Sequence, residues 1–264
     1  MRKEPKIGHI TIWSDQHFPF HDQDAHSAIY AFVKDWQPDY HIHIGDCLDL
    51  GGISKHTEND YVAQYEEPVE DGLIALGKHF NTLFDITPDS KVVWVWGNHD
   101  DRLFRFVKKN PSWRKILDQP LRLLREFGGV EDIRRIKLVI LEDFEDEYKI
   151  GRMRFVHGHW TNKHVACKHV EAYDDSVVFG HAHTMQMFTI QKQQPRAGYC
   201  VGHLTDRRAR RYLRGSPARW VTGFGHAQYL KSNGQYTMSL IPIVNSGFIF
   251  ADKFYHSSQW RKND

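Results

Sequence analysis

Cysteines and long apolar runs are scarce in this sequence. Its 264 residues contain three cysteines, with no CxxC pair, at positions 47, 167 and 200. An odd and widely spaced set excludes a disulfide framework and favours a reducing compartment. No stretch approaches the roughly 18 apolar residues of a membrane helix, and the basic N-terminus lacks the apolar segment of a signal peptide. We therefore expect a cytoplasmic protein with no membrane partner.

An excess of charge of either sign is also absent. Lysine and arginine number 35 against 33 acidic residues, so the formal net charge is only +2. The overall charge therefore does not indicate nucleic-acid binding, and any basic surface must be local. One local candidate is the segment RRARRYLR at 207–214, which has five arginines around Tyr212. It could follow a nucleic-acid backbone, or it could be an ordinary solvated surface.

Apolar patterns divide the chain into a helix-rich first half and a strand-rich second half. With helical patterns between them, short apolar runs predict strands over 7–13, 40–44 and 91–96. After residue 135 the pattern changes to strands over 137–141, 153–156, 177–179 and 185–193. This order predicts an α/β core sheet packed on a second, largely antiparallel sheet.

No linker, repeat or low-complexity segment divides the chain. We therefore expect a single domain over residues 1–264. The mostly helical and charged stretch 101–135 is expected to form an inserted lobe over the core. Near the C-terminus, Asn233-Gly234 lies between two β-rich stretches and predicts a hairpin with a type I′ turn.

Each of five predicted strands is followed by residues that can bind metal. The strand tips read SDQH, GDCLD, GNHDD, HGH and GHAH. Because the carboxyl ends of strands in an open α/β sheet line one crevice, these tips are expected to converge. Their candidate residues are Asp15, His17, Asp46, Asp49, Asn98, His99, His157, His181 and His183.

The residue types at these tips indicate a metal site. Carboxylates and imidazoles without thiolates suit Mn²⁺, Fe, Zn²⁺ or Mg²⁺. Six or seven such ligands exceed what one ion with open positions needs, so we expect two ions. Two ions about 3.5–4 Å apart can clamp an in-line displacement at phosphorus. Gly45, Gly97 and Gly180 directly precede candidate ligands, and the lack of a side chain lets the backbone approach closely.

The motifs D-x-H, G-D-x-x-D, G-N-H-D, H-G-H and G-H-x-H occur in this order within residues 10–185. As an ordered set they resemble the calcineurin-like metallophosphoesterase family. The resemblance implies that family's fold, a four-layer α/β/β/α sandwich, which agrees with the helix-then-strand order above. The stretch 198–224 resembles the C-terminal part of small bacterial and phage-encoded members.

The resemblance also implies two divalent ions, most simply Mn²⁺, with Fe, Zn²⁺, Ni²⁺ or Mg²⁺ as alternatives. Asp46 would bridge them. His99 would not bind metal but would assist the leaving group, and Asp49 would orient it, because an imidazole needs a carboxylate partner to fix its tautomer. The first ion would also be bound by Asp15, His17 and His183. The second ion would also be bound by Asn98, His157 and His181.

Two further positions bear on the substrate. Protein Ser/Thr phosphatases of this superfamily continue after Asp49 with Arg-Gly, whereas this chain has Leu50-Gly51. The missing arginine weakens a phosphoprotein interpretation. Arg102, in the first turn of the helix after GNHD, is a candidate phosphate contact, because a guanidinium pairs with phosphate through two hydrogen bonds. A solvated helix face is the alternative.

Together these features predict a dinuclear metal-dependent phosphoester hydrolase in which a hydroxide between the ions attacks phosphorus in line. The local arginines and the missing Arg-Gly favour a phosphodiesterase that acts on nucleotides or nucleic-acid ends. The alternatives are a phosphomonoesterase or protein phosphatase, and a non-catalytic metal-binding scaffold of the same fold. The sequence leaves the oligomeric state and the physiological substrate open.

Overall fold

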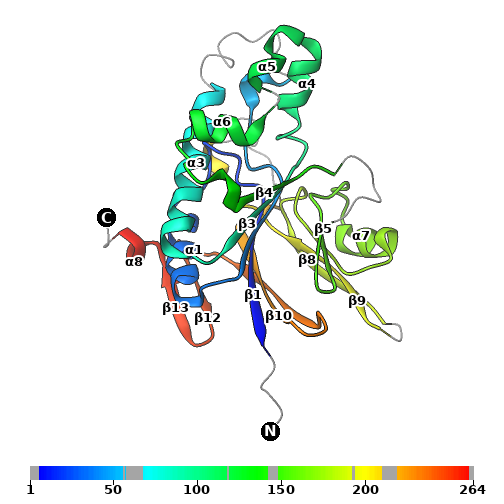
Figure 1. Ribbon diagram of the computed structural model, residues 1–264. Coiled ribbons are helices and arrows are strands. Elements are labelled where there is room, and N and C mark those ends of the chain that lie inside the picture. The colour runs from blue at the N-terminus through cyan, green and yellow to red at the C-terminus, as the bar shows by residue number, and fades with distance from the viewer. Residues whose placement is uncertain are drawn as a thin grey trace.

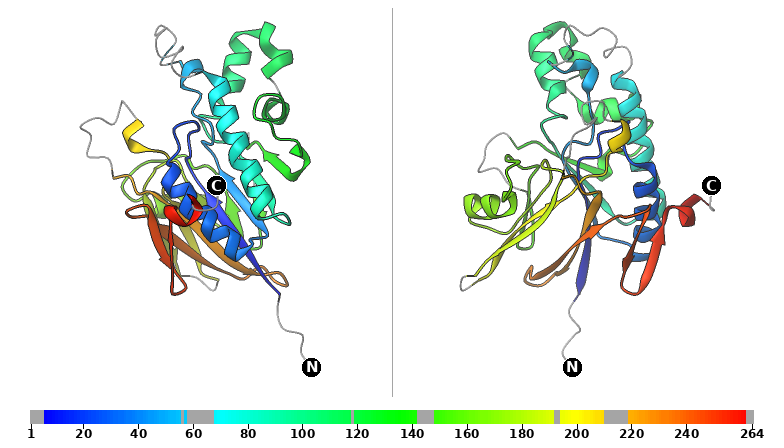
Figure 2. Two further views of the ribbon diagram at one scale, coloured as in Figure 1. Left: turned by 90° about the vertical axis from the view of Figure 1, so that its left-hand side faces the viewer. Right: turned by 180° about the vertical axis from the view of Figure 1, so that it is seen from behind.

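The computed structural model describes residues 6–55, 57, 68–117, 119–141, 148–191, 194–209 and 219–261. In this part of the chain two β-sheets pack face to face, and helices cover their outer faces (Figure 1). The N-terminal end of the described chain and its C-terminal helix lie on different sides of the molecule (Figure 2).

The first sheet consists of β1 (Ile7–Trp13), β2 (Tyr40–Ile44), β3 (Lys91–Val95), β4 (Ile136–Val139), β10 (Gly223–Leu230) and β11 (Tyr236–Pro242). Their order is β11-β10-β1-β2-β3-β4. β1 to β4 run parallel, while β10 pairs antiparallel with both β1 and β11. The strands predicted over 7–13 and 40–44 are present with those bounds, and the one predicted over 91–96 ends a residue earlier.

The second sheet consists of β5 (Tyr148–Ile150), β6 (Met153–Phe155), β7 (Val177–Phe179), β8 (Met185–Ile190) and β9 (Arg196–Val201), in the order β5-β6-β7-β9-β8. β7 pairs parallel with both β6 and β9. At the two edges, β5 pairs antiparallel with β6, and β8 pairs antiparallel with β9. The prediction of a largely antiparallel sheet was therefore wrong. The cause is α7 (Val165–Tyr173), a crossover helix that returns the chain to lay β7 parallel to β6.

Helices also fill the connections in the first half of the chain. α1 (Gln23–Trp36) follows β1, and η1 (Gly51–Ile53) and α3 (Val69–Ile86) follow β2. Between β3 and β4, where a helical lobe was predicted over 101–135, lie α4 (Arg102–Lys109), η2 (Pro111–Trp113), α5 (Arg114–Leu117), α6 (Pro120–Glu126) and η3 (Ile133–Arg135). Figure 1 shows α4 and α5 extending from one end of the sandwich.

The C-terminal elements support α1. The hairpin of β12 (Gly247–Phe250) and β13 (Lys253–His256) and the short helix α8 (Ser257–Arg261) pack against this helix (Figure 2). α1 itself begins where Asp22 accepts a hydrogen bond from the backbone N–H of Ala25, and it ends at Gln37, which has a left-handed backbone before Pro38. None of the described helices combines the length and the apolar character that crossing a bilayer requires.

Alternating side chains on the strands produce three apolar cores and hence four layers. Between the two sheets, Ile12 of β1 and Phe155 of β6 belong to one core. On the other face of the first sheet, Trp13 packs in a second core with Phe32 of α1. The third core joins α7 to the outer face of the second sheet. Because parallel strands are buried on both faces, each needs apolar residues on both sides, and the expected α/β/β/α sandwich is formed.

The hairpin predicted at Asn233-Gly234 joins β10 to β11, but its turn is not of type I′. Gly234 has a φ of +71°, whereas Asn233 is not among the residues with positive φ. A type I′ turn needs a positive φ at both central positions. The backbone N–H of Leu230 donates to the carbonyl of Gln235, which closes a loop longer than the two residues of a type I′ connection.

Several buried imidazoles lie outside the strand tips. His26, His41, His79 and His226 are each at most 2% exposed. Burial is the main reason that the pKa of His41 and of His226 falls to about 3, and that the pKa values of His26 and His79 fall well below 6.5. These four side chains are therefore neutral in the folded protein at neutral pH.

We predict that acid destabilises the protein through these buried histidines. In the unfolded chain these histidines take up protons near pH 6.5, whereas in the folded chain they do so only at much lower pH. The free energy of unfolding is therefore highest above pH 6.5 and decreases as the pH falls below this value. Each histidine costs about 1.4 kcal/mol per pH unit in this range. Urea unfolding of chelator-treated protein at pH 7.5, 6 and 5 measures the effect, and an unfolding free energy that is constant over this range would contradict it.

Candidate metal centre

The predicted strand tips meet where the two sheets adjoin. Loops after β1, β2 and β3 come from the first sheet, and loops after β6 and β7 come from the second. The backbone N–H of His181 donates to Oδ2 of Asp15 over 2.9 Å, and Nδ1 of His157 lies 2.9 Å from the carbonyl oxygen of Ile44. These contacts join the tips of the two sheets directly. The predicted tips therefore converge, but they come from two sheets and not from the edge of one sheet.

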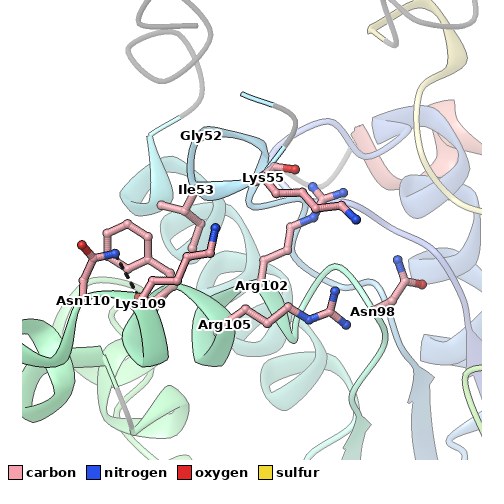
Figure 3. Close-up of a pocket in the computed structure, with 10 residues that line it drawn as sticks. Gly52, Ile53, Lys55, Asn98, Arg102, Arg105, Lys109 and Asn110 are labelled. Carbon is pink, nitrogen blue, oxygen red and sulfur yellow. Dashed lines mark hydrogen bonds between the residues drawn. The ribbon is translucent and has the colours of Figure 1, made fainter. Parts of the chain in front are cut away.

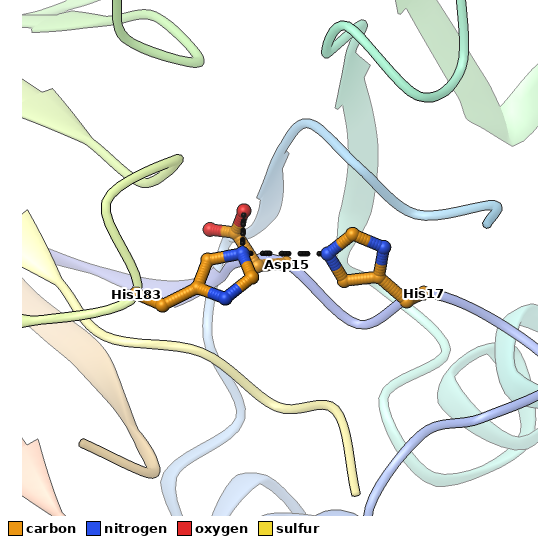
Figure 4. Close-up of side chains that lie close together, drawn as sticks. All are labelled: Asp15, His17 and His183. Carbon is orange, nitrogen blue, oxygen red and sulfur yellow. Dashed lines mark hydrogen bonds and ion pairs between the residues drawn. The ribbon is translucent and has the colours of Figure 1, made fainter. Parts of the chain in front are cut away.

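The first group of ligands is Asp15, His17 and His183 (Figure 4). Their ligand atoms all lie within 4.8 Å of one another. Nε2 of His183 is 3.0 Å from Oδ1 of Asp15 and 3.4 Å from Nε2 of His17. All three side chains are buried. The structure thus brings together the set that the sequence assigned to the first ion.

The second group is Asp46, His157 and His181, with Asn98 beside it. Nε2 of His157 lies 3.3 Å from Oδ2 of Asp46, 3.2 Å from Nδ1 of His181 and 3.0 Å from Oδ1 of Asn98. The same Oδ2 of Asp46 is 3.9 Å from Nε2 of His17 in the first group. Asp46 therefore lies between the two groups, where the predicted bridging role requires it.

The donor atoms of both groups fit divalent cations. Oδ1 of Asp15 accepts no hydrogen bond in the described structure, although Nε2 of His183 lies 3.0 Å away. Nδ1 of His17 is held by Asp49, and Nδ1 of His157 by the carbonyl of Ile44, so each ring turns its Nε2 toward the other ligands. Metal-binding histidines are held through the second ring nitrogen in this way. The set is oxygen and nitrogen without thiolate, which suits Mn²⁺, Fe or Zn²⁺.

The backbone at the ligands is strained. Five of them have a left-handed backbone, with φ between 48° and 64°: Asp15, His17, Asp46, His181 and His183. This region costs a non-glycine residue of order 1–3 kcal/mol and persists only where the surroundings enforce it. Such residues cluster at functional sites, and here they aim side chains from short loops at one point.

Close backbone packing explains two of the predicted glycines. A Cβ on Gly97 would lie 2.3 Å from Oδ1 of Asp46, and one on Gly180 would lie 2.3 Å from Oδ2 of Asp15. Neither glycine has a positive φ. The requirement at these positions is therefore space for the ligand carboxylates and not an unusual backbone conformation.

The charges of the site are strongly coupled. Burial raises the pKa of Asp46, but the neighbouring imidazoles, His157 foremost, outweigh it and hold that pKa well below its usual range. Burial lowers the pKa of His157, but Asp46 and Asp15 outweigh it and raise the pKa to about 10. Burial, followed by the charge of His157, lowers the pKa of His181 to about 4. The buried carboxylates of Asp46 and Asp15 thus stay ionised. They attract positive charge, which a bound cation would supply.

Asp49 orients two imidazoles. Its Oδ1 lies 3.0 Å from Nδ1 of His17 and 3.1 Å from Nδ1 of His99. Since a carboxylate only accepts, both rings donate through Nδ1. Nη2 of Arg102 lies 3.0 Å from Nε2 of His99, and Nη1 donates to the carbonyl of Asp49 over 2.8 Å. Arginine has no acceptor, so Nε2 of His99 accepts here.

Asp100, the first acidic residue of the GNHDD tip, belongs to the G-N-H-D motif, but the sequence assigned it no role. It is fully buried, and its carboxylate accepts the backbone N–H groups of Leu48 and Gly97, each over 2.9 Å. Burial, with the nearby charge of Asp46, raises its pKa to about 7. Asp100 therefore ties the loop after β2 to the loop after β3, and only the position of Asp100 in the fold reveals this.

Sequence reasoning missed Gln16, which lies between the ligands Asp15 and His17. Its Nε2 lies 2.9 Å from Nε2 of His26 and 3.3 Å from Nε2 of His79, and its Oε1 lies 2.8 Å from Nδ1 of His43. The amide nitrogen can only donate and the amide oxygen can only accept, so one side chain sets the tautomers of three buried histidines. These hydrogen bonds hold the loop that carries Asp15 and His17 in place.

Part of the arginine-rich segment 207–214 lies outside the described residues, which end at 209 and resume at 219. Of the described part, η4 (Arg207–Ala209) begins the segment, and the exposed Arg208 pairs with Asp206 at 3.0 Å. A nucleic-acid surface formed by the remaining arginines stays a prediction.

No family model matches this chain. By sequence it is similar to two proteins of Mycobacterium phages, the gene 54 protein of phage D29, with 27% identity over 260 residues, and that of phage L5, with 26% over 254 residues. Both matches cover 90% of this chain and 95% of the relative. The sequence similarity therefore extends along nearly the whole chain.

Two solved structures of vacuolar protein sorting 29 also align with this chain. The one from Cryptosporidium parvum has a TM-score of 0.47 at 14% identity and covers 95% of both chains. The one from Entamoeba histolytica, a complex with zinc, has a TM-score of 0.39 at 12% identity and covers 89% of this chain and 98% of that chain. These TM-scores are low, so the description of the fold rests on the chain's own topology.

Asp46→Asn should lower metal occupancy at both groups, because Asp46 lies between them and asparagine brings no negative charge. His157→Ala should remove metal mainly from the second group. Elemental analysis of protein purified and reloaded with Mn²⁺ checks both expectations. Two retained ions per chain in Asp46→Asn would contradict the bridging position.

Gln16→Leu should lower both the stability and the metal affinity of the first group. Removing the amide leaves buried histidine nitrogens without partners, at a cost of about 1–3 kcal/mol, and releases the loop that aims Asp15 and His17, which typically weakens metal binding about 10–100-fold. Gln23→Leu, at an exposed position of α1, is the matched control. Urea unfolding and Mn²⁺ titration measure the two effects, and a Gln16→Leu protein with wild-type metal affinity would remove the positioning role.

Proposed function

We propose that this chain is a dinuclear metal-dependent phosphoester hydrolase of the calcineurin-like metallophosphoesterase family. One observation carries the proposal: two ligand groups, one from Asp15, His17 and His183 and one from His157 and His181, lie on either side of Asp46. The motifs and the fold agree with it. The similarity to two phage gene 54 proteins supports a phage-type member.

The chain would hold two divalent ions, which we propose are Mn²⁺, through the oxygen and nitrogen donors described above. When bound, such ions activate water at neutral pH and stabilise the charge that develops on phosphate oxygens. The protein contributes fixed geometry. Asp49 and the carbonyl of Ile44 hold the ligand rings of His17 and His157, and Asp100 fixes the loops that carry Asp46 and Asn98.

His99 would assist the leaving group, and Arg102 would bind a phosphate oxygen. In the structure Arg102 donates a hydrogen bond to Nε2 of His99. This hydrogen bond must break before His99 can act as an acid through the same nitrogen. A substrate phosphate offers Arg102 a charged acceptor, which forms a stronger hydrogen bond with arginine than an imidazole nitrogen does. Substrate binding would therefore free Nε2 of His99, which is still held by Asp49 through Nδ1, to take up a proton from solvent, and the resulting imidazolium would donate this proton to the leaving oxygen.

We further propose that the substrate is a phosphodiester, namely a nucleotide or a nucleic-acid end. Leu50 occupies the place where protein phosphatases of this superfamily have an arginine, so the phosphoprotein alternative lacks its phosphate contact. A scaffold without catalysis would not need His99 held by Asp49 beside the ligands. The three cysteines are free thiols, which suits the proposed intracellular location.

The wild-type protein with Mn²⁺ should hydrolyse bis-p-nitrophenyl phosphate faster than p-nitrophenyl phosphate. His99→Ala should keep its metal and lose about 10²–10⁴-fold in turnover, the usual contribution of a general acid. The loss should be larger for an alkyl ester than for a p-nitrophenyl ester, because a good leaving group needs no proton. His256→Ala in β13, remote in sequence from every tip, serves as the control. Equal losses for both kinds of ester would remove the acid role.

A further inference from the structure

A pocket lies beside the metal centre, between η1 and α4 (Figure 3). Its volume is about 520 Å³, which is within the usual range for small-molecule sites. Asn98 lines the pocket, and its Oδ1 also contacts His157 in the second ligand group. Arg102 lines it as well and contacts His99. The pocket therefore opens directly onto the candidate centre, on the side of His99.

The lining of this pocket is strongly cationic. Arg102, Arg105 and Lys109 lie on one face of α4, because positions three and four apart in a helix are neighbours. Lys55, after η1, adds a fourth cation, and no acidic residue is among the described lining residues. Asp101 pairs with Arg105 at 2.5 Å and offsets one charge. A cleft with an excess of one charge attracts ligands of the opposite charge, so the pocket suits an anion.

The pocket also has an apolar surface. Phe106 lines it between the cationic positions of α4, together with Ile53 of η1. The ring of Phe106 is half-buried and lies 6.5 Å from that of Trp113. Cations beside an aromatic ring are the combination with which proteins bind a nucleotide unit, since the cations hold the phosphate and the ring stacks on the base. An inorganic anion alone would not use the apolar part.

We propose that this pocket binds the nucleotide unit next to the scissile phosphate of a single-stranded nucleic acid. The neighbouring phosphate would contact Arg105 and Lys109, and the base would pack on Phe106. This rests on the proposed function, which places the scissile phosphate at the metal ligands. It assigns nucleotide recognition to α4, whereas the sequence had suggested the arginines of 207–214 for this role.

Binding of a short labelled oligothymidylate to chelator-treated protein, followed by fluorescence anisotropy, tests the pocket without catalysis. Arg105→Ala and Lys109→Ala should each weaken binding about tenfold, as expected for a hydrogen bond to a charged group. Each should also reduce the salt slope by about 0.7, the value for one phosphate contact on a single strand. Lys108→Ala is the matched control, because it removes the same charge from an exposed position of α4 outside the pocket.

Phe106→Leu should weaken binding of oligothymidylate but not of an abasic oligonucleotide of equal length. Thermal unfolding of each variant establishes that it is folded. Equal effects of Lys108→Ala and the two pocket variants, or no binding by the wild type, would overturn the proposal. Equal effects of Phe106→Leu on the two oligonucleotides would overturn the base contact.

Hydrolysis of bis-p-nitrophenyl phosphate by the wild type with Mn²⁺ separates this proposal from the proposed function. If the diester is hydrolysed but the binding pattern is absent, the pocket assignment is wrong and the phosphoesterase stands. If the binding pattern is present but no phosphoester is hydrolysed, the pocket is a nucleic-acid site and the phosphoesterase function is wrong.

Discussion

The candidate centre depends on the contact between two sheets. Three of its loops belong to the first sheet and two to the second, so the ligands converge only while the sheets keep one relative position. The apolar core between the sheets provides that constraint over a large area. At the tips, the N–H of His181 donates to Asp15, and the ring of His157 reaches the carbonyl of Ile44. Each ligand group has members from both sheets, so any shift of one sheet against the other would move the ligands within both groups apart.

Buried polar side chains hold the ligand loops in place through hydrogen bonds. Asp100 joins two loops of the first sheet, Gln16 anchors the third through buried histidines, and Asp49 aligns one ligand ring together with His99. In a low-dielectric interior hydrogen bonds are stronger than in water, so such networks hold the loops firmly. The left-handed backbone of several ligands is tolerated because these partners leave the loops no alternative.

The same arrangement connects the chemistry to recognition. Asp46 and Asp15 concentrate negative charge at the ligands, while α4 presents cations a short distance away, with Asn98 and Arg102 shared between the two regions. A phosphate would meet bound cations on one side and guanidinium groups on the other. The contact between Arg102 and His99 links the two regions, because the same arginine lines the pocket and lies beside an imidazole near the ligands.

The sequence by itself predicted the strands that became β1, β2 and β3 and the polar residues that lie together after them. These depend on local patterns: apolar alternation along a strand and a glycine-marked tip directly after it. Tertiary structure decided which strands became neighbours, since β10 pairs with β1 across more than two hundred residues of chain, and the crossover helix α7 made the second sheet mixed.

Tertiary structure also decided the roles of Asp100, Gln16 and the cationic face of α4. Asp100 lies in the GNHDD tip and Gln16 lies between two ligands, but the local sequence does not show which groups these residues or α4 contact. Their partners, Leu48, His79 and Lys55 among them, lie tens of residues away in the chain. A sequence pattern reports which residues a segment buries or exposes, whereas a hydrogen bond or a shared pocket depends on where two distant segments are brought together by packing.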